Sequence, residues 1–407
     1  MADPQFPPEI FEKFIGHLAD GEDASERRSN LRTCCYVSRI WCGLAQPILF
    51  SQVVLQSWTE SQVEQFYESI STRPDLQVAF LCIKLDMQEP CPRLVDVIQR
   101  LTKLRCLRLI LDEFPYASLH HDFLSHLPPT LKSTRITSLS LASICDFPVQ
   151  LFFHLVALEE LALKDMTYGG LKDPTPSPLD PSRWKPQLRV LLLSTTRYEE
   201  ADIVPWFLAS ECAFDLSRLS TFWAIERSNS DVAYGLVCGL VASVSSSLED
   251  VLIDPPTGCV GNQPLTNTFP SQELQSLRIA TVAMLQDGYE SFNAVPWLIN
   301  FLTNLPEPDK LEELELPCEF RGSNCKSQQG LIRQGWPKVD ILLGSSVFRN
   351  LKDVRIICYC ERGNDESFML RSSLNLILPQ LLKRGILRVE YTGLTSYVTS
   401  RIRPWLD

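Results

Sequence analysis

Clustered histidines are the residues of this sequence most suggestive of metal chemistry. His120-His121-Asp122 stands close to His126, and a helical zinc site usually sets two histidines four residues apart. The residue four positions before His126 is Asp122, so these two side chains could share one helical face. Two ligands do not close a metal site. We therefore expect a solvated helix face here and no bound metal.

Cysteine gives the second set of candidate ligands. Cys358-Tyr359-Cys360 follows an expected strand, and Cys318 and Cys325 precede it in the chain. Structural zinc sites typically use Cys-x-x-Cys pairs, and none of the fourteen cysteines forms one. Because cysteine is among the most buried residue types, we expect these residues and Cys34-Cys35 to fill the core. A zinc site is the weaker alternative.

Motifs for covalent or phosphate chemistry are missing from the sequence. It contains no Gly-x-x-x-x-Gly-Lys-Ser/Thr loop, no Gly-x-Gly-x-x-Gly fingerprint and no Gly-x-Ser-x-Gly elbow. We therefore expect a protein that is not an enzyme and that needs no cofactor. A deep pocket with a perturbed acid–base pair would revive the enzyme hypothesis.

Composition and charge narrow the class of protein further. The 407 residues are 45% hydrophobic and 21% charged, which is ordinary for a globular chain. The formal charge of −11 argues against a free-standing nucleic-acid binder. The sequence has no secretory signal and no apolar run of the roughly 18 residues that span a membrane. These features predict a cytoplasmic or nuclear protein with neither nucleic acid nor membrane as a partner.

The first fifty residues predict a pair of amphipathic helices. Pro7 and Pro8 stand where a helix can start, and Pro47 is expected to end the second helix. The acidic stretch 20–23 is expected to close the first helix. Each helix has one apolar face, formed by Ile10, Phe11, Phe14, Ile15 and Leu18 in the first and by Leu31, Cys34, Val37, Trp41 and Leu44 in the second. Two helices of this length bury too little surface to be stable alone, so they must pack on something.

These residues resemble the F-box family. The matching segments are Phe6-Pro7-Pro8-Glu9-Ile10-Phe11, His17-Leu18, Leu31-Arg32-Thr33-Cys34 and Val37-Ser38-Arg39-Ile40-Trp41. The ending, Ala45-Gln46-Pro47-Ile48-Leu49-Phe50, is similar to that of fungal members of the family. Two features depart from the family pattern. Phe6 replaces the usual leucine, and the expected turn from Ala19 to Asn30 is longer than in the family.

The resemblance implies that residues 4–50 bind the Skp-type adaptor of a cullin–RING ubiquitin ligase. The implied contacts, or their immediate supports, are Phe6, Pro7, Pro8, Ile10, Phe14, Leu18, Leu31, Cys34, Val37 and Trp41. Phe14 could instead face the domain's own core. Gly16 inside the first helix costs about 1 kcal/mol against alanine, which is easier to understand if a partner approaches closely there.

Beyond residue 50, an aliphatic-x-x-aliphatic-x-aliphatic pattern recurs, with the middle positions 22 to 40 residues apart. Strand-like copies alternate with helix-like segments, for example Val63, Phe66, Tyr67 and Ile70, which is typical of a leucine-rich repeat solenoid. Polar residues between the aliphatic ones, such as Glu312-Glu313, are expected on the concave face of the sheet. The copies are Phe80/Ile83/Leu85, Leu104/Leu107/Leu109, Ile136/Leu139/Leu141, Leu158/Leu161/Leu163, Leu188/Leu191/Leu193, the weaker Leu219/Phe222/Ala224, Leu248/Val251/Ile253, Leu274/Leu277/Ile279, Leu311/Leu314/Leu316 and Leu351/Val354/Ile356.

The predicted fold class is therefore α/β: an N-terminal all-α F-box helical hairpin, then an irregular leucine-rich repeat solenoid of parallel strands with helices on the convex side. The expected domains are 4–50, 51–390 and a C-terminal tail, 391–407. The solenoid is irregular because the repeats lack the usual Asn or Cys after the last leucine. The alternative is a generic α/β domain with a parallel sheet. Segments 173–181, 255–270 and 321–335 are expected to be surface loops.

The function implied by this resemblance is that of a substrate-recognition subunit of a Skp-cullin-F-box type ubiquitin ligase. The helices would bind the adaptor, and the repeats would bind a target protein that the sequence does not identify. The alternative function is a leucine-rich repeat scaffold or inhibitor unrelated to ubiquitination, in which the helices only cap the repeats. Exposure separates the two, because a cap buries Pro8, Ile10 and Leu18 within the chain, whereas a docking module leaves an apolar patch open.

Overall fold

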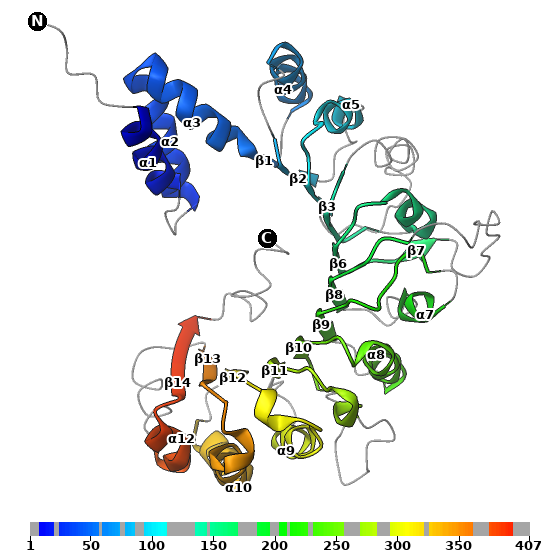
Figure 1. The fold of residues 1–407 in the computed structure, drawn as a ribbon, viewed down its shortest axis with the longest axis vertical. Helices are drawn as coiled ribbons and strands as arrows, with labels where there is room; N and C mark the ends of the chain where they lie inside the picture. Colours follow the sequence, from blue (N-terminus) through cyan, green and yellow to red (C-terminus); the bar gives the residue numbers. More distant parts are fainter. Residues whose placement is uncertain are drawn as a thin grey trace, which may run out of the picture. The chain divides into compact units, whose positions relative to one another are not determined.

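The computed structural model divides into two compact units, residues 1–158 and 159–407. It describes residues 8–19, 24–56, 59–73, 78–85, 93–111, 135–144, 147–169, 185–195, 203–209, 212–226, 231–255, 269–282, 294–320, 325–360 and 374–393. Both units are mixed α/β, and Figure 1 gives the labels of their helices and strands. Twelve of the described strands pair in parallel, four in the first unit and eight in the second.

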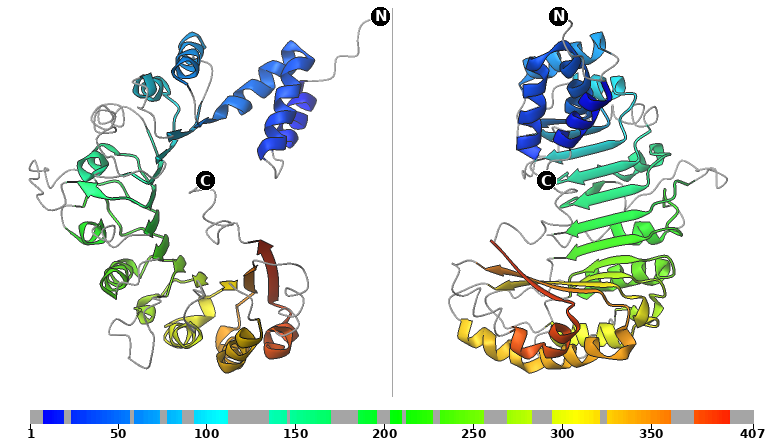
Figure 2. Two further views of the ribbon diagram at one scale, coloured as in Figure 1. Left: turned by 180° about the vertical axis from the view of Figure 1, so that it is seen from behind. Right: turned by 60° about the vertical axis from the view of Figure 1, so that its left-hand side comes forward.

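The first unit begins with three helices and continues with strands that alternate with helices (Figures 1 and 2). Its four paired strands lie in the order β1-β2-β3-β4. The elements are α1 (Pro8–Ala19), α2 (Ala24–Val37), α3 (Arg39–Ser51), β1 (Gln52–Gln56), α4 (Glu60–Thr72), β2 (Phe80–Leu85), α5 (Arg93–Arg100), β3 (Cys106–Leu111), β4 (Ser138–Ala142), β5 (Phe147–Pro148) and the 3-10 helix η2 (Val149–His154).

The second unit repeats strand and helix, with its paired strands in the order β6-β8-β9-β10-β11-β12-β13-β14. Helices α7, α8, α9 and α10 lie on one side of these strands in Figure 1. The elements are β6 (Glu160–Lys164), β7 (Tyr168–Gly169), β8 (Val190–Thr195), α7 (Ile203–Leu208), β9 (Thr221–Glu226), α8 (Asp231–Val244), β10 (Asp250–Ile253), η4 (Ser271–Glu273), β11 (Ile279–Val282), α9 (Val295–Thr303), η5 (Pro308–Lys310), β12 (Glu313–Phe320), α10 (Cys325–Gly344), η6 (Ser346–Phe348), β13 (Asp353–Cys360), α12 (Pro379–Arg384) and β14 (Leu387–Gly393).

The N-terminal helical region has three helices instead of the expected two. The second expected helix breaks at Ser38, which is extended (φ −162°, ψ 167°) and caps α3 by accepting the Trp41 N–H at 3.3 Å. Pro47 does not end α3 but lies inside it. Ile48 and Leu49 after it pack on the bundle core, and this packing offsets the hydrogen bond that proline cannot donate. Helix α2 begins at Ala24, so part of the expected turn is helical.

Strand pairing corrects the frame of two expected repeats. Leu81 pairs with Leu107, so the first strand copy is Val78/Leu81/Ile83, shifted by two residues from the expected one. Ala280 pairs with both Val251 and Leu314, so the later copy is Leu277/Ala280/Val282. The other expected copies, including the weak one, coincide with paired strands. Two strands of the parallel set, β1 and β14, were not expected, and β14 runs past the boundary expected at residue 390.

An apolar row crosses the sheet face opposite the helices in the first part of the second unit. Ala162, Leu192, Trp223 and Leu252 are neighbours in register on successive strands, and all four are buried in one cluster with Ile225. The expected polar face is therefore interrupted by an apolar row from β6 to β10, while Glu160, Thr221 and Asp250 precede members of the row by two residues and lie on the same face. Strands that are buried on both faces carry continuous apolar runs, such as Val190 to Leu193, instead of an alternating pattern.

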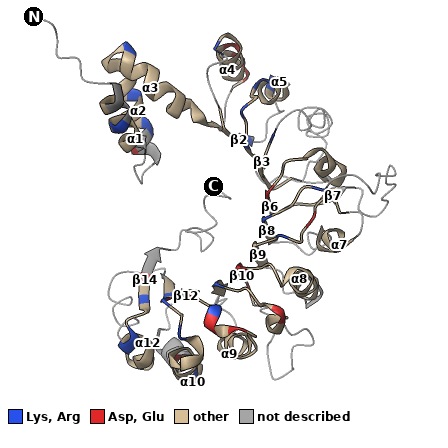
Figure 3. Cartoon of the chain, viewed as in Figure 1, with Lys and Arg blue, Asp and Glu red and all other residues tan. Residues whose placement is uncertain are grey.

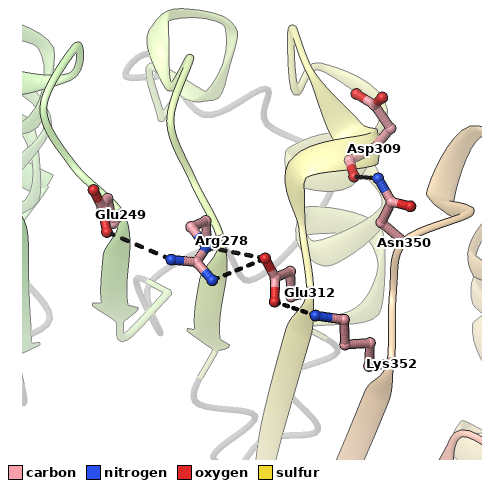
Figure 4. Close-up of polar contacts among 6 residues, drawn as sticks. All are labelled: Glu249, Arg278, Asp309, Glu312, Asn350 and Lys352. Carbon is pink, nitrogen blue, oxygen red and sulfur yellow. Dashed lines mark hydrogen bonds and ion pairs between the residues drawn. The ribbon is translucent and has the colours of Figure 1, made fainter.

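Charged residues alternate in sign just before the strands further along this unit (Figure 4). Arg278 pairs with Glu312 at 2.9 Å and with Glu249 at 4.0 Å, and Lys352 pairs with the other side of Glu312 at 2.6 Å. Lys352 and Arg278 hold the pKa of Glu312 below its usual value. Because opposite charges face one another only when neighbouring repeats are in this register, the row favours the observed pairing.

The third expected loop, 321–335, is largely helical, because α10 starts at Cys325. Buried Trp336, Val339 and Leu343 anchor the C-terminal half of α10, and this packing favours a helix over a loop. The loop expected at 173–181 lies outside the described residues, as does most of 255–270. Among the helices that the structure describes, none combines the length and apolar character needed to cross a membrane.

Candidate functional site

The N-terminal bundle, defined as α1, α2 and α3, has a hydrophobic core of its own. Four buried side chains from its three helices form the cluster, namely Ile15, Leu31, Cys34 and Ala45. Partly buried residues pack around them, including Leu18, Cys35, Trp41, Leu44, Ile48 and Leu49. The three helices thus bury these side chains against one another. Their remaining apolar side chains are not needed to close this core.

Large apolar side chains stay exposed on the same bundle. The exposed fractions are 51% for Ile10, 50% for Phe14, 89% for Tyr36, 60% for Val37 and 61% for Ile40. Ile10 and Phe14 are one turn apart on α1, and the other three stand at the corner where α2 ends and α3 begins. Exposed apolar side chains on neighbouring helices of one bundle are typical of a surface that another protein covers.

Aromatic contacts hold part of this surface in place. The Trp41 ring is half-buried and meets Phe11 and Phe14 edge-on, at centroid distances of 5.6 and 5.3 Å. These contacts join α1 to α3 and are favourable beyond the area they bury. We call Ile10, Phe14, Tyr36, Val37, Ile40 and Trp41 the Trp41 surface.

The residues implied by the F-box resemblance divide into three groups. Ile10, Phe14 and Val37 are exposed and lie on the Trp41 surface with half-buried Trp41. Leu31 and Cys34 are buried in the bundle core, and Leu18 is partly buried and packs against it. Phe6 and Pro7 lie outside the described residues. Pro8 begins α1, but its side chain is not among those described.

Two residues of this surface, Tyr36 and Ile40, were not among the contacts expected from the sequence. A continuous helix from Leu31 to Leu44 would place them on its polar face, where a large apolar residue is already unusual. That mismatch was the signal available in the sequence. The break at Ser38 then places both at the corner between two helices.

Three of the described residues near the Trp41 surface are exposed and basic, although the chain carries a net charge of −11. Lys13, Arg32 and Arg39 are exposed on the bundle, each adjacent to or one turn from a member of the surface. Figure 3 shows blue Lys and Arg on α1 to α3. A partner with acidic side chains around an apolar patch would complement this arrangement.

A pocket lies in the later unit, lined by residues of α7, of α8 and of the segment between α7 and β9. Its lining includes Phe207, Leu208, Cys212, Phe214 and Asp215. Burial raises the pKa of the Cys212 thiol to about 11, which disfavours the nucleophilic thiolate. Asp215 has a lowered pKa chiefly because the backbone N–H of Ser217 donates to it, at 2.9 Å. Both shifts thus have structural causes, burial for Cys212 and a backbone hydrogen bond for Asp215.

The cysteines and histidines of the described ranges form no cluster of three or more potential metal ligands. Cys318 and Cys358 are neighbours in register on β12 and β13, and both are buried, as expected for packing residues. His120, His121, Asp122 and His126 lie outside the described residues. No family model matches the chain, and no curated protein matches its sequence.

Proposed function

We propose that this protein is a substrate receptor of a Skp-cullin-F-box type ubiquitin ligase. The N-terminal bundle acts as the F-box and binds the Skp-type adaptor, and the following parallel strand–helix units act as a leucine-rich repeat solenoid that holds a target protein. The protein itself is not catalytic in this proposal. It works in the cytoplasm or nucleus by raising the local concentration of the target near the charged conjugating enzyme.

The observation that carries the proposal is the Trp41 surface. A bundle that only capped the repeats would turn its apolar residues toward the chain, but Ile10, Phe14 and Ile40 are half or more exposed. The buried cluster that includes Ile15 and Leu31 is complete without them. A cluster of apolar and aromatic side chains with a charged rim has the composition of a protein interface.

The strand–helix units support the second half of the proposal. Leu107, Leu139, Leu161 and Leu191 occupy equivalent buried positions on their strands, as leucines of a repeat do. Hydrogen bonds between neighbouring repeats continue beyond the strands, for example from Glu249 N to Ser220 O at 2.9 Å. Such stacking gives a stiff support for a bound target. This suits a receptor that must fix the distance between the adaptor and the target.

The test is adaptor binding by the full-length chain. We expect the wild-type chain to form a stable complex with a purified Skp-type adaptor in titration calorimetry. Ile40→Asp places a charge within the proposed interface and should weaken binding at least tenfold, since an unpaired charge in an interface costs several kcal/mol. Because Ile40 is 61% exposed, the variant should remain folded.

The matched control is Ile341→Asp on α10. Ile341 is 60% exposed, so the substitution has the same chemistry at the same exposure but lies far from the bundle in sequence. This variant should bind the adaptor as wild type does. Failure of the wild-type chain to bind any Skp-type adaptor would reject the proposal and favour the rival function, a repeat scaffold or inhibitor outside ubiquitination.

A further inference from the structure

Strand β14 is the last strand in the row of the second unit and pairs with β13 (Figure 1). The Val354 N–H of β13 donates to the carbonyl oxygen of Ile386, just before β14, at 2.8 Å, so Ile386 directs its backbone groups toward β13. Successive residues of a strand direct their backbone groups alternately to the two sides. The N–H and C=O groups of Leu387, Val389 and Tyr391 therefore point to the outer edge of the sheet, and no strand among the described residues pairs with them there.

The apolar side chains of β14 are less completely covered than those of β13. Leu387 pairs in register with Val354, and Val389 pairs with Ile356. Both β13 residues are fully buried, whereas Leu387 and Val389 are partly exposed. Leu382, on the helix α12 that packs beside β14, is 49% exposed. This end of the sheet thus combines outward backbone groups with partly exposed apolar side chains, which favours association of one sheet edge with another.

Two opposite charges lie on the other face of β14. Arg388 and Glu390 are two residues apart on the strand, and their side chains are 65% and 53% exposed. Within the chain, Arg388 Nε pairs with Asp353 at 3.1 Å, and Glu390 Oε1 pairs with Arg355 Nε at 3.4 Å. A guanidinium has five N–H donors and a carboxylate has two acceptor oxygens. Both side chains can therefore bind a further opposite charge from a partner.

We propose that β14 pairs in antiparallel fashion with β14 of a second copy of this chain, which makes a dimer with two-fold symmetry. The outward N–H and C=O groups of Val389 in the two copies bond to each other at the symmetry axis. Leu387 of one copy then lies opposite Tyr391 of the other, and Arg388 lies opposite Glu390. The Arg388 and Glu390 positions form the pairs without backbone hydrogen bonds, in which the Cα atoms are only about 4.5 Å apart and the side chains are close.

Charge complementarity selects this register and a second copy as the partner. A shift of one residue would set outward backbone groups opposite inward ones. A shift of two residues would set Arg388 opposite Arg388 in one direction and Glu390 opposite Glu390 in the other, and like charges directly opposite each other are destabilising. The strand is therefore complementary to itself in the register centred on Val389. The inference concerns the chain itself and does not depend on adaptor binding.

The test is the oligomeric state of the full-length chain, measured by sedimentation velocity over a range of concentrations. We expect a monomer–dimer equilibrium with a dissociation constant in the micromolar range, because one strand pair and its flanking side chains bury a small area. Val389→Pro removes the outward N–H at the centre of the pairing without removing a hydrogen bond to β13, so this variant should be monomeric. Val389→Ala is the matched control, because it shortens the same side chain but keeps that N–H, and it should still dimerise.

Charge reversal tests the register. Arg388→Glu sets two glutamates opposite each other, and Glu390→Lys sets an arginine opposite a lysine, so each variant alone should dimerise at least about tenfold more weakly than wild type. An equimolar mixture of the two variants should dimerise again, because each glutamate then faces a basic side chain of the other variant. The substitutions also change the contacts with Asp353 and Arg355 inside each chain. Mixing leaves those contacts as they are, so recovery of the dimer reports the interface alone.

Three results would overturn the proposal. One is a wild-type chain, folded by circular dichroism, that stays monomeric at every concentration. Another is a dimer that survives Val389→Pro, because the interface would then lie elsewhere. The third is a pair of folded charge-reversal variants that each dimerise as wild type does, or whose mixture stays monomeric. Adaptor binding is measured separately on the wild-type chain, so failure of this inference is distinguishable from failure of the proposed function.

Discussion

The Phe14 ring meets the Trp41 indole edge-on, with centroids 5.3 Å apart and planes inclined at 64°. Half of the Phe14 side chain nevertheless remains open to solvent. One edge of the ring therefore helps to hold α1 against α3, and the rest is available to a partner. This dual position explains why sequence reasoning alone left Phe14 between the core and the interface.

Truncating the Trp41 and Phe14 rings should distinguish effects on the free energy of unfolding from effects on adaptor binding. Trp41→Ala removes the contacts with both Phe11 and Phe14 and should destabilise the bundle by about 2 kcal/mol or more. Phe14→Ala removes one of those contacts and a half-exposed ring, so its cost should be nearer 1 kcal/mol. We expect Phe14→Ala to weaken adaptor binding by more than this stability loss explains. Urea unfolding with calorimetry on the same samples measures both; equal binding by Phe14→Ala and wild type would place Phe14 outside the interface.

Two helical glycines give a matched pair for mapping the docking face. A Cβ added at Gly16 in α1, or at Gly43 in α3, would meet no atom within 4 Å. Each substitution to alanine should therefore stabilise its helix by up to about 1 kcal/mol. If a partner packs closely on α1, only Gly16→Ala should weaken adaptor binding, despite the added stability. Thermal unfolding and titration of both variants make the comparison, and a Gly16→Ala protein that binds at full strength would show that no close approach occurs there.

Polar substitutions in the buried row of the sheet should destabilise the protein. The same substitutions on an exposed concave surface would be tolerated. Leu192 lies between Ala162 and Trp223, and all three are buried. Leu192→Asn should cost about 3 kcal/mol, because it removes apolar contacts and buries an amide without partners. The control is Thr221→Asn on the neighbouring strand, which changes a half-buried polar residue and should cost less than 1 kcal/mol. Similar urea midpoints for the two variants would contradict the burial of this row.

Parallel pairing of the repeats was predictable, because leucines at fixed offsets within each repeat fit few other arrangements of the strands. The frame was less predictable where a strand has apolar residues on both faces, since either set then matches the pattern. Phe80 illustrates this: it fits the first position of a repeat but lies on the opposite face, where the Arg108 guanidinium stacks 5.6 Å from its ring. Pairing with Leu107 decides the frame, and pairing is a tertiary property that one strand does not encode.

Helix ends in the bundle were harder to predict than helix faces. Ser38 interrupts a continuous apolar pattern, and Pro47 continues a helix that propensity would end. In both cases tertiary packing overrides the local signal. The exposed residues of the candidate site could be read only after the break at Ser38 was known, because Tyr36 and Ile40 follow from the corner and not from either helix alone.

Titration of Cys212 should make the second unit less stable in alkaline solution. Burial raises the pKa of this thiol from 9.0 to about 11. Because the folded-state pKa is raised, the full free energy of unfolding is present below pH 9. The part that depends on the neutral Cys212 thiol is lost as pH rises from about 9 to 11. A pKa difference of this size corresponds to roughly 3 kcal/mol of unfolding free energy. Cys212→Ala should lack this part of the decline in unfolding free energy between pH 8.5 and 11, and an unchanged slope would mean that another group causes it.

Arg384 provides the clearest link between a single side chain and the end of the repeats. The aliphatic pattern would place a leucine at this position, three residues before Leu387, which pairs with Val354. The guanidinium instead donates to three carbonyl oxygens, those of Leu343 at 2.6 Å, Phe348 at 2.9 Å and Leu351 at 3.2 Å. It thereby joins the ends of α10 and η6 to the end of α12, the helix that precedes the last strand.

Arg384→Ala should therefore cost about 2 to 4 kcal/mol, because three partly buried carbonyls lose charge-assisted hydrogen bonds. Lys383→Ala removes the same charge from the adjacent, exposed residue and should change the unfolding free energy by less than about 0.5 kcal/mol. Arg384→Lys keeps the charge but cannot reach three acceptors in one plane, so it should fall between the two. If Arg384→Ala and Lys383→Ala unfold at the same urea concentration, net charge and not carbonyl capping is what Arg384 contributes to this end of the sheet.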